Sequence, residues 1–190
     1  MCIRDRIEVV TVYAFAIDNF KRDPDEVHAL MELARTRLLE LYEQSDFVAR
    51  HSICIRVVGH REYLPPSAGD STPRRRSNTA QYRVCCLCQS VYATDARPTL
   101  NICMPYASQA EICHAAQQAT KNSQQLTPAS LSSHLMVPDD PPVDILVRTS
   151  RVSRLSDFLL WQSNEHTQMH FVDQYWPMFG ACDLIPILLE

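Results

Sequence analysis

The sequence has little glycine, little lysine and no long apolar run. Only 3 of its 190 residues are glycine, so most turns are expected to use proline, asparagine, aspartate and serine. No apolar run reaches the roughly 18 residues of a membrane-spanning helix, and no secretory signal opens the chain. We therefore expect any membrane association to be peripheral or through a partner. The formal charge of −4 gives no overall positive field, which argues against nucleic acid as a partner. The 18 basic residues are arginines except for Lys21 and Lys121.

The eight cysteines do not have the spacing of a small disulfide-rich scaffold, which indicates a reducing compartment. Cys54, Cys103 and Cys113 fall in or beside predicted elements, where a thiol serves as a small apolar side chain. The run 85–88 contains three cysteines and suggests a zinc site, but no second pair of cysteine or histidine follows at a suitable distance. We therefore favour the interpretation without zinc.

Length and composition predict one globular domain over residues 1–190, with 46% hydrophobic and 21% charged residues. Residues 1–6 fit no element and are interpreted as a scar or a mistranslated start. Residues 65–97 are interpreted as an irregular insertion or loop, with a helical period only near 88–94. The arginines at 74–76 suggest either a nucleic-acid patch or, as we favour, a solvated loop.

Strands and helices alternate along the rest of the chain. Apolar and β-branched runs predict strands at 7–15, 52–59, 99–104, 143–147 and near 169–172. Helical periods and capping patterns predict helices at 24–44, 108–121, 127–135 and 177–189. Asp23 with Glu26, and Ser108 with Glu111, are expected to form capping boxes. This order predicts an α/β fold in which helices flank a mostly parallel sheet.

A polar turn follows the apolar run 143–147. It holds Arg148, Arg151 and Arg154, with hydroxyls that include Ser156. Guanidinium groups and hydroxyls at the carboxyl end of a parallel strand are suited to bind an anion such as a phosphate. A solvated basic loop is the alternative.

The same pattern places other polar residues at the ends of strands. Seven residues are expected at or just after the carboxyl end of a strand: Asn19, Arg22, Gly59, Tyr106, Arg148, Arg154 and Ser156. Because parallel strands end at one edge of a sheet, this rim is predicted to carry most of the chemistry. His60, next to Gly59, is expected to be structural or solvent-facing rather than catalytic.

Four segments resemble the cis-prenyltransferases, and among them the eukaryotic dehydrodolichyl diphosphate synthase branch. The longest is Arg148-Thr-Ser-x-x-x-Arg154-Leu-Ser-Asp-Phe-Leu-Leu-Trp-Gln162, and the second is the block from Val10 to Arg22, similar to the family's Y-A-F-S-x-E-N-x-x-R. Leu100-Asn-Ile-Cys-Met-Pro-Tyr-Ala-Ser108 and Trp176-Pro177 match in the expected order. The resemblance covers about residues 7–64 and 98–190.

The resemblance implies repeated condensation of isopentenyl diphosphate onto an allylic, farnesyl-type diphosphate. The product would be a long polyprenyl diphosphate for dolichol synthesis and protein glycosylation. Arg148, Arg154 and Ser156 would bind isopentenyl diphosphate, Arg22 would bind the allylic diphosphate, and the catalytic residue Asn19 would lie near the reacting carbons. Mg²⁺ is the implied cofactor. The apolar stripe of the helix at 24–44 is either simply core or, as the family implies, partly the wall of a product tunnel.

Several family features are not matched. The amino-terminal D-G-N-R-R segment, whose aspartate binds Mg²⁺, has no counterpart, so no residue is assigned to metal and the sheet is expected to lack its first strand. Ala16 replaces a serine, Arg151 a glycine that needs a positive φ, and Val152 a glutamate. The chain ends without the R-x-G tail that eukaryotic catalytic subunits of this kind borrow from a partner resembling the Nogo-B receptor.

That resemblance predicts a heteromer at the cytosolic face of the endoplasmic reticulum membrane. The alternative is a non-catalytic family member that acts as a binding or scaffolding subunit. The retained Asn19, Arg22 and Arg148 argue for the enzyme, and the unmatched aspartate segment argues for the scaffold.

Overall fold

The computed structural model describes residues 7–43, 46–51, 53–60, 63, 81–82, 98–123, 125–137 and 140–189. It forms two compact units, Met1–Asp139 and Asp140–Glu190, each of which is described by itself. The expectations for residues 1–6, for the arginines at 74–76, for the cysteines at 85–88 and for a helix at 88–94 lie outside the described residues.

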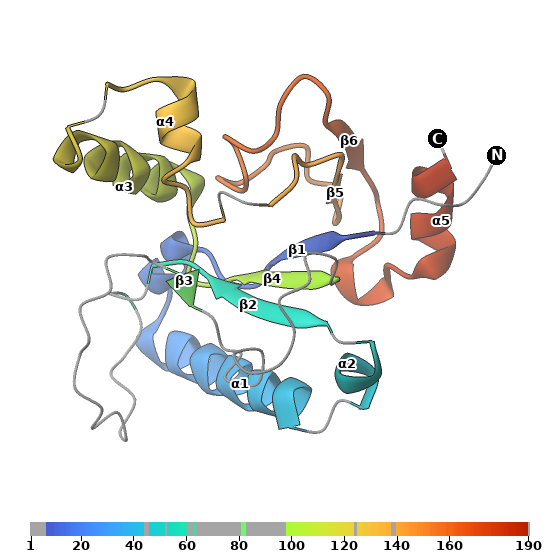
Figure 1. Cartoon of the computed structure of the whole chain (residues 1–190). Helices are drawn as coiled ribbons and strands as arrows, with labels where there is room; N and C mark the ends of the chain where they lie inside the picture. The colour runs from blue at the N-terminus through green and yellow to red at the C-terminus, as the bar shows by residue number, and fades with distance from the viewer. Residues whose placement is uncertain are drawn as a thin grey trace. The chain divides into compact units, whose positions relative to one another are not determined.

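The first unit is built on a four-stranded sheet with the order β1-β4-β2-β3 (Figure 1). Its parallel strands are β1 (Val9–Tyr13), β4 (Thr99–Cys103) and β2 (Cys54–Val58). The two-residue strand β3 (Gln81–Tyr82) runs antiparallel beside β2. The predicted mostly parallel α/β sheet is therefore confirmed.

The central strand β4 pairs on both sides, with Thr99 opposite Val9 on one side and opposite Cys54 on the other. Four of its five residues are buried, as expected for a strand with neighbours on both edges. β1 is an edge strand of the described sheet, and none of its five residues is fully buried.

Helix α1 (Pro24–Glu43) connects β1 to β2 and runs below the sheet in the view of Figure 1. The Asp23 carboxylate accepts from the Asp25 N–H at 3.0 Å, as its predicted capping role requires. The expectation that Glu26 completes a capping box is wrong, because its Oε1 instead accepts from Arg22 Nη1 at 2.6 Å. The short helix α2 (Asp46–Arg50), which the sequence pattern does not predict, lies between α1 and β2.

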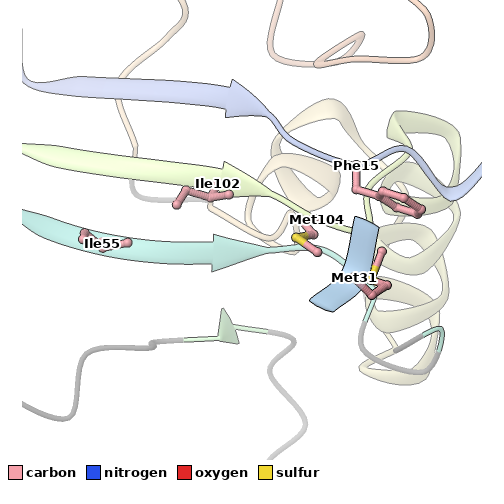
Figure 2. Close-up of a cluster of buried hydrophobic side chains, with 5 residues drawn as sticks. All are labelled: Phe15, Met31, Ile55, Ile102 and Met104. Carbon is pink, nitrogen blue, oxygen red and sulfur yellow. The ribbon is translucent and has the colours of Figure 1, made fainter. Parts of the chain in front are cut away.

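One hydrophobic cluster joins α1 to the sheet. Phe15, Met31, Ile55, Ile102 and Met104 are its buried members, each at most 8% exposed, and Figure 2 shows them on the sheet, its carboxyl ends and α1. Val27, Leu30, Ala34 and Leu38 of the α1 stripe pack against this cluster. The apolar stripe of α1 therefore belongs to the hydrophobic core. That part of it also forms the wall of a product tunnel stays a prediction.

After β4 the chain forms two helices, α3 (Ser108–Lys121) and α4 (Pro128–Ser132). The predicted capping box of Ser108 and Glu111 is wrong. The N-cap is Ala107 without a side-chain bond, and both Ser108 and Glu111 are buried, because Glu111 points into the fold toward other partners. Thr127 does form a capping box, with Ser130.

The second unit contains β5 (Ile145–Arg148) and β6 (Gln168–Phe171), which pair in parallel. The predicted terminal helix at 177–189 is divided into the 3-10 turn η3 (Trp176–Met178) and α5 (Ala181–Leu189). Asp183 explains the break, since its Oδ2 accepts from the Gly180 N–H at 2.9 Å and so begins a new helix after the glycine.

Candidate functional site

The carboxyl ends of β1, β2 and β4 meet through backbone hydrogen bonds. The Tyr106 N–H donates to the Phe15 carbonyl at 3.0 Å, and the His60 N–H donates to the Pro105 carbonyl at 2.8 Å. Residues that follow three separate strands thus form one edge. The strand ends of the first unit meet as the sequence pattern predicts, and the chemistry expected at this rim stays a prediction.

Asn19 and Arg22 lie where β1 ends. The 3-10 turn η1 (Ile17–Lys21) carries Asn19, whose N–H donates to the Ala16 carbonyl at 3.0 Å. The Arg22 N–H in turn donates to the Asn19 carbonyl at 3.1 Å, so the two residues are held within one turn. The Arg22 side chain is about half exposed and pairs with Glu26, which leaves its guanidinium within reach of solvent.

A buried pair of side chains follows β4, next to this turn. Tyr106 is 0% exposed and Glu111 is 1% exposed, and the Tyr106 hydroxyl donates to Glu111 Oε2 at 2.5 Å. Burial, reinforced by the negative Glu111, raises the pKa of the Tyr106 hydroxyl far above its ordinary value. Tyr106 therefore stays protonated and is the donor of this bond.

Gly59 makes the close approach between β2 and the segment after β4 possible. Its φ is +154°, and a Cβ placed there would lie 2.2 Å from the Pro105 carbonyl oxygen. Next to it, His60 is 7% exposed, and its ring contacts Tyr63 and His114 edge to face at 6.2 Å. This buried, ring-packed position agrees with the structural role predicted for His60.

In the second unit, Arg148 ends β5. It is partly exposed, yet its Nε is buried and has no hydrogen-bond partner among the described residues. A buried guanidinium N–H without an acceptor is costly, and an anionic ligand is a suitable acceptor. The Arg148 carbonyl is held in place, because it accepts from the Val172 N–H at 2.8 Å.

The turn after Arg148 has unusual backbone conformations. Positive φ values occur at Ser150, Arg151, Ser156, Asp157 and Leu159, between 48° and 71°. The expected positive φ at position 151 is thus present, at 56°, although the residue is arginine. Hydrogen bonds to the segment after β6 hold this turn, from Ser150 N–H to the Gln174 carbonyl at 2.8 Å and from Arg151 N–H to the Val172 carbonyl at 3.2 Å.

Arg151 and two further residues of this turn, Arg154 and Ser156, differ in their surroundings. Arg151 forms an exposed ion pair with Asp173 at 3.2 Å. Arg154 and Ser156 are exposed, and both follow Arg148 along the same turn. The structure therefore holds Arg148, Arg154 and Ser156 on one segment of the second unit, and Asn19 and Arg22 on one turn of the first.

The described residues contain no group of three or more histidine, cysteine, aspartate or glutamate side chains that fits a metal ion. The Mg²⁺ that the family resemblance implies stays a prediction. The described helices also include none that is both long and apolar enough to cross a bilayer.

The sequence pattern does not reveal the position of Glu111. A glutamate three residues after a serine, at the start of a helix, has the pattern of a capping box. The hydrogen bonds that Glu111 accepts from the Tyr106 hydroxyl and the Met136 N–H show that it is a buried acceptor and not a capping residue. Both donors are close to it only in the folded chain. Tyr106 itself is expected at the rim, but no local signal indicates its hydroxyl bond.

Comparison with known proteins identifies similarity over the whole chain. The family described as "Putative undecaprenyl diphosphate synthase" matches residues 1–190. A dehydrodolichyl diphosphate synthase complex subunit of Schizosaccharomyces pombe is 32% identical, over 100% of this chain and 70% of the relative. The corresponding subunit of Homo sapiens is 35% identical over 100% of this chain, but the chain spans only 55% of the human protein.

A solved structure has the same fold. It is lavandulyl diphosphate synthase from Lavandula x intermedia in complex with dimethylallyl diphosphate, with a TM-score of 0.72 and 25% identity. The similarity covers 96% of this chain and 75% of that one.

Proposed function

The chain belongs to the undecaprenyl diphosphate synthase family, the cis-prenyltransferases, and from this membership we propose that it condenses isopentenyl diphosphate onto an allylic diphosphate. Residues 1–190 then form a single domain of this family. Support comes from the yeast and human relatives, which are named subunits of a dehydrodolichyl diphosphate synthase complex. The proposed product is a long polyprenyl diphosphate that serves dolichol synthesis and protein glycosylation.

The observation that carries the proposal is the buried Nε of Arg148, which finds no acceptor among the described residues. Arg148 lies at the carboxyl end of a parallel strand, where α/β folds bind their ligands. A diphosphate oxygen would provide the missing acceptor, and the planar guanidinium matches phosphate geometry. Arg154 and Ser156, exposed on the same turn, supply a further cation and a hydroxyl for isopentenyl diphosphate.

Arg22 is assigned to the allylic diphosphate, and Asn19 to the carbons that react. The Arg22 side chain is about half exposed although it pairs with Glu26. A diphosphate that replaced the Glu26 carboxylate would still balance the positive charge of Arg22. Asn19 is only partly exposed on the same turn, and we assign it to the reacting carbons.

In the proposed reaction a carbon–carbon bond forms between the terminal alkene carbon of isopentenyl diphosphate and the first carbon of the allylic diphosphate. The carbon–oxygen bond of the allylic diphosphate breaks, and the diphosphate leaves with the electron pair. The double bond of the isopentenyl unit then shifts as a proton is lost from its second carbon. Cationic side chains around the leaving diphosphate stabilise the charge that develops on it.

Magnesium belongs to the proposal as an ion that arrives with the diphosphates, since Mg²⁺ is often held by substrate phosphates with few protein ligands. We also propose a heteromeric partner that resembles the Nogo-B receptor, and association with the cytosolic face of the endoplasmic reticulum membrane. The support is that the Schizosaccharomyces pombe and human relatives are named as subunits of a complex.

The test is calorimetric titration of the folded chain with isopentenyl diphosphate in the presence of Mg²⁺. Arg148→Ala and Arg154→Ala are each expected to weaken binding at least about tenfold, because a charge-assisted phosphate contact is lost. Arg50→Ala is the matched control, since Arg50 is 77% exposed and pairs loosely with Asp46, at 3.6 Å. A folded chain that does not bind isopentenyl diphosphate would contradict the proposal and favour the scaffolding subunit.

A further inference from the structure

Glu111 is a buried carboxylate that the proposed chemistry does not use. It is 1% exposed, and burial of a carboxylate is costly unless hydrogen bonds compensate it. Both of its oxygens are compensated, Oε2 by the Tyr106 hydroxyl at 2.5 Å and Oε1 by the Met136 N–H at 2.9 Å. Its place in the first turn of α3 adds the favourable field of the helix N-terminus.

The Glu111 bond fixes the side chain of Tyr106, whose backbone is attached to the end of β1. The Tyr106 carbonyl accepts from the Ile17 N–H and from the Tyr13 hydroxyl, both at 3.1 Å. The Tyr106 N–H donates to the Phe15 carbonyl at 3.0 Å. Three hydrogen bonds thus connect one tyrosine to residues 13–17, directly before Asn19.

We infer that Glu111 is a positioning residue, which acts through Tyr106 to hold the turn that carries Asn19 and Arg22 in the geometry for the allylic diphosphate. This inference rests on the proposed function, because it concerns how the chain binds the allylic diphosphate. It makes Glu111 and Tyr106 parts of the substrate site that do not touch substrate. Isopentenyl diphosphate, assigned to the second unit, is not expected to depend on them.

The decisive variant is Tyr106→Phe, which removes only the hydroxyl and keeps the buried ring. The probes are farnesyl S-thiolodiphosphate, which cannot be turned over, and isopentenyl diphosphate, each titrated separately into the full chain with Mg²⁺. Binding of the farnesyl analogue is expected to weaken about tenfold, the effect of about one lost hydrogen bond, while isopentenyl diphosphate binds unchanged. Tyr175→Phe is the matched control, because the Tyr175 side chain is largely exposed at 68%.

Glu111→Gln and Glu111→Ala form a second pair. The glutamine side chain keeps an oxygen that can accept from the Met136 N–H. Its amide NH₂ can donate to the Tyr106 hydroxyl oxygen, which then acts as the acceptor. It is therefore expected to restore most of the farnesyl-analogue affinity that alanine loses. Equal losses in both variants would contradict the positioning role.

Amide hydrogen exchange gives a readout that needs no substrate. In Tyr106→Phe, exchange in residues 16–22 is expected to rise, while exchange in β2 stays as in the wild type. A uniform rise across the unit, with both ligands weakened together, would mean that Tyr106 only stabilises the fold and would overturn this inference alone. A wild-type chain that binds neither probe would overturn the proposed function and this inference together.

Discussion

The arginines of the candidate site differ in what surrounds their guanidinium groups. Arg22 and Arg151 already have carboxylate partners, Glu26 at 2.6 Å and Asp173 at 3.2 Å. Arg148 has a buried Nε that finds no acceptor within the described part of the chain. Because exposed ion pairs add little stability, the paired arginines remain able to exchange their partners for a ligand.

Arg22→Ala is expected to weaken binding of an allylic diphosphate at least about tenfold and to change the free energy of unfolding by no more than about 0.5 kcal/mol. The reason is that its ion pair with Glu26 lies on the surface, whereas a phosphate contact would be charge-assisted. Titration with farnesyl S-thiolodiphosphate and urea unfolding measure the two effects. Arg35→Ala is the control, because Arg35 forms a similar exposed pair with Glu32 at 3.0 Å. Equal binding by both variants would refute the assignment of Arg22.

Arg151→Gly is expected to raise the free energy of unfolding by up to about 1 kcal/mol, since glycine adopts the observed φ of 56° without a Cβ penalty. The lost ion pair with Asp173 is exposed and offsets only a small part of this gain. Thermal and urea unfolding measure the change. Asp173→Asn removes the ion pair without a backbone effect, and a clear destabilisation in this variant would show that the pair matters more than the strain.

Three elements depend on close contact at the carboxyl edge of the first sheet. β1, β2 and β4 are each only five residues long, and their ends are joined by the hydrogen bonds of Tyr106 and His60. The hydrogen bonds that hold this edge together are therefore made mainly by the loops that follow the strands. Gly59 is the residue at which a side chain would disturb this contact.

Gly59→Ala is expected to lower the free energy of unfolding by about 2 kcal/mol or more, because the new Cβ would meet the Pro105 carbonyl oxygen at 2.2 Å. Urea unfolding measures the change. Gly180→Ala is the matched control, because no described atom lies within 4 Å of the position that a Cβ would take there, and only a small effect is expected. Similar stability of both variants would contradict the close approach.

The second unit exposes large apolar side chains, which bears on how the whole protein associates with others. Tyr175, Trp176 and Met178 are 68%, 63% and 76% exposed, and Leu189 is 63% exposed. Exposed apolar side chains gathered in one segment favour contact with another protein. The segment 175–189 is thus a candidate surface for the proposed partner subunit.

Trp176→Ser is expected to weaken association with a Nogo-B-receptor-like subunit at least about tenfold, since a buried tryptophan often dominates an interface. Co-expression followed by size-exclusion chromatography with light scattering measures the complex. Leu126→Ser serves as the control, because Leu126 is 55% exposed in the other unit. Unchanged complex formation by Trp176→Ser would exclude this segment from the interface.

The order and the type of most elements follow from local sequence patterns. The strand expected at 7–15 contains the observed β1, the helices expected at 24–44 and 108–121 match α1 and α3, and the parallel sheet is confirmed. The physical reason is that apolar periodicity and cap residues are local features, which neighbouring residues alone can encode. The family is also indicated by sequence, through its long arginine motif.

The partners of the polar residues, in contrast, depend on tertiary contacts. Glu26 binds Arg22 and Glu111 binds Tyr106, although both glutamates have the local pattern of a capping box. The buried Nε of Arg148 and the contact of Gly59 with Pro105 depend on how separate segments of the chain pack. A side chain's burial and its hydrogen-bond partner are set by such packing, and no local pattern contains them.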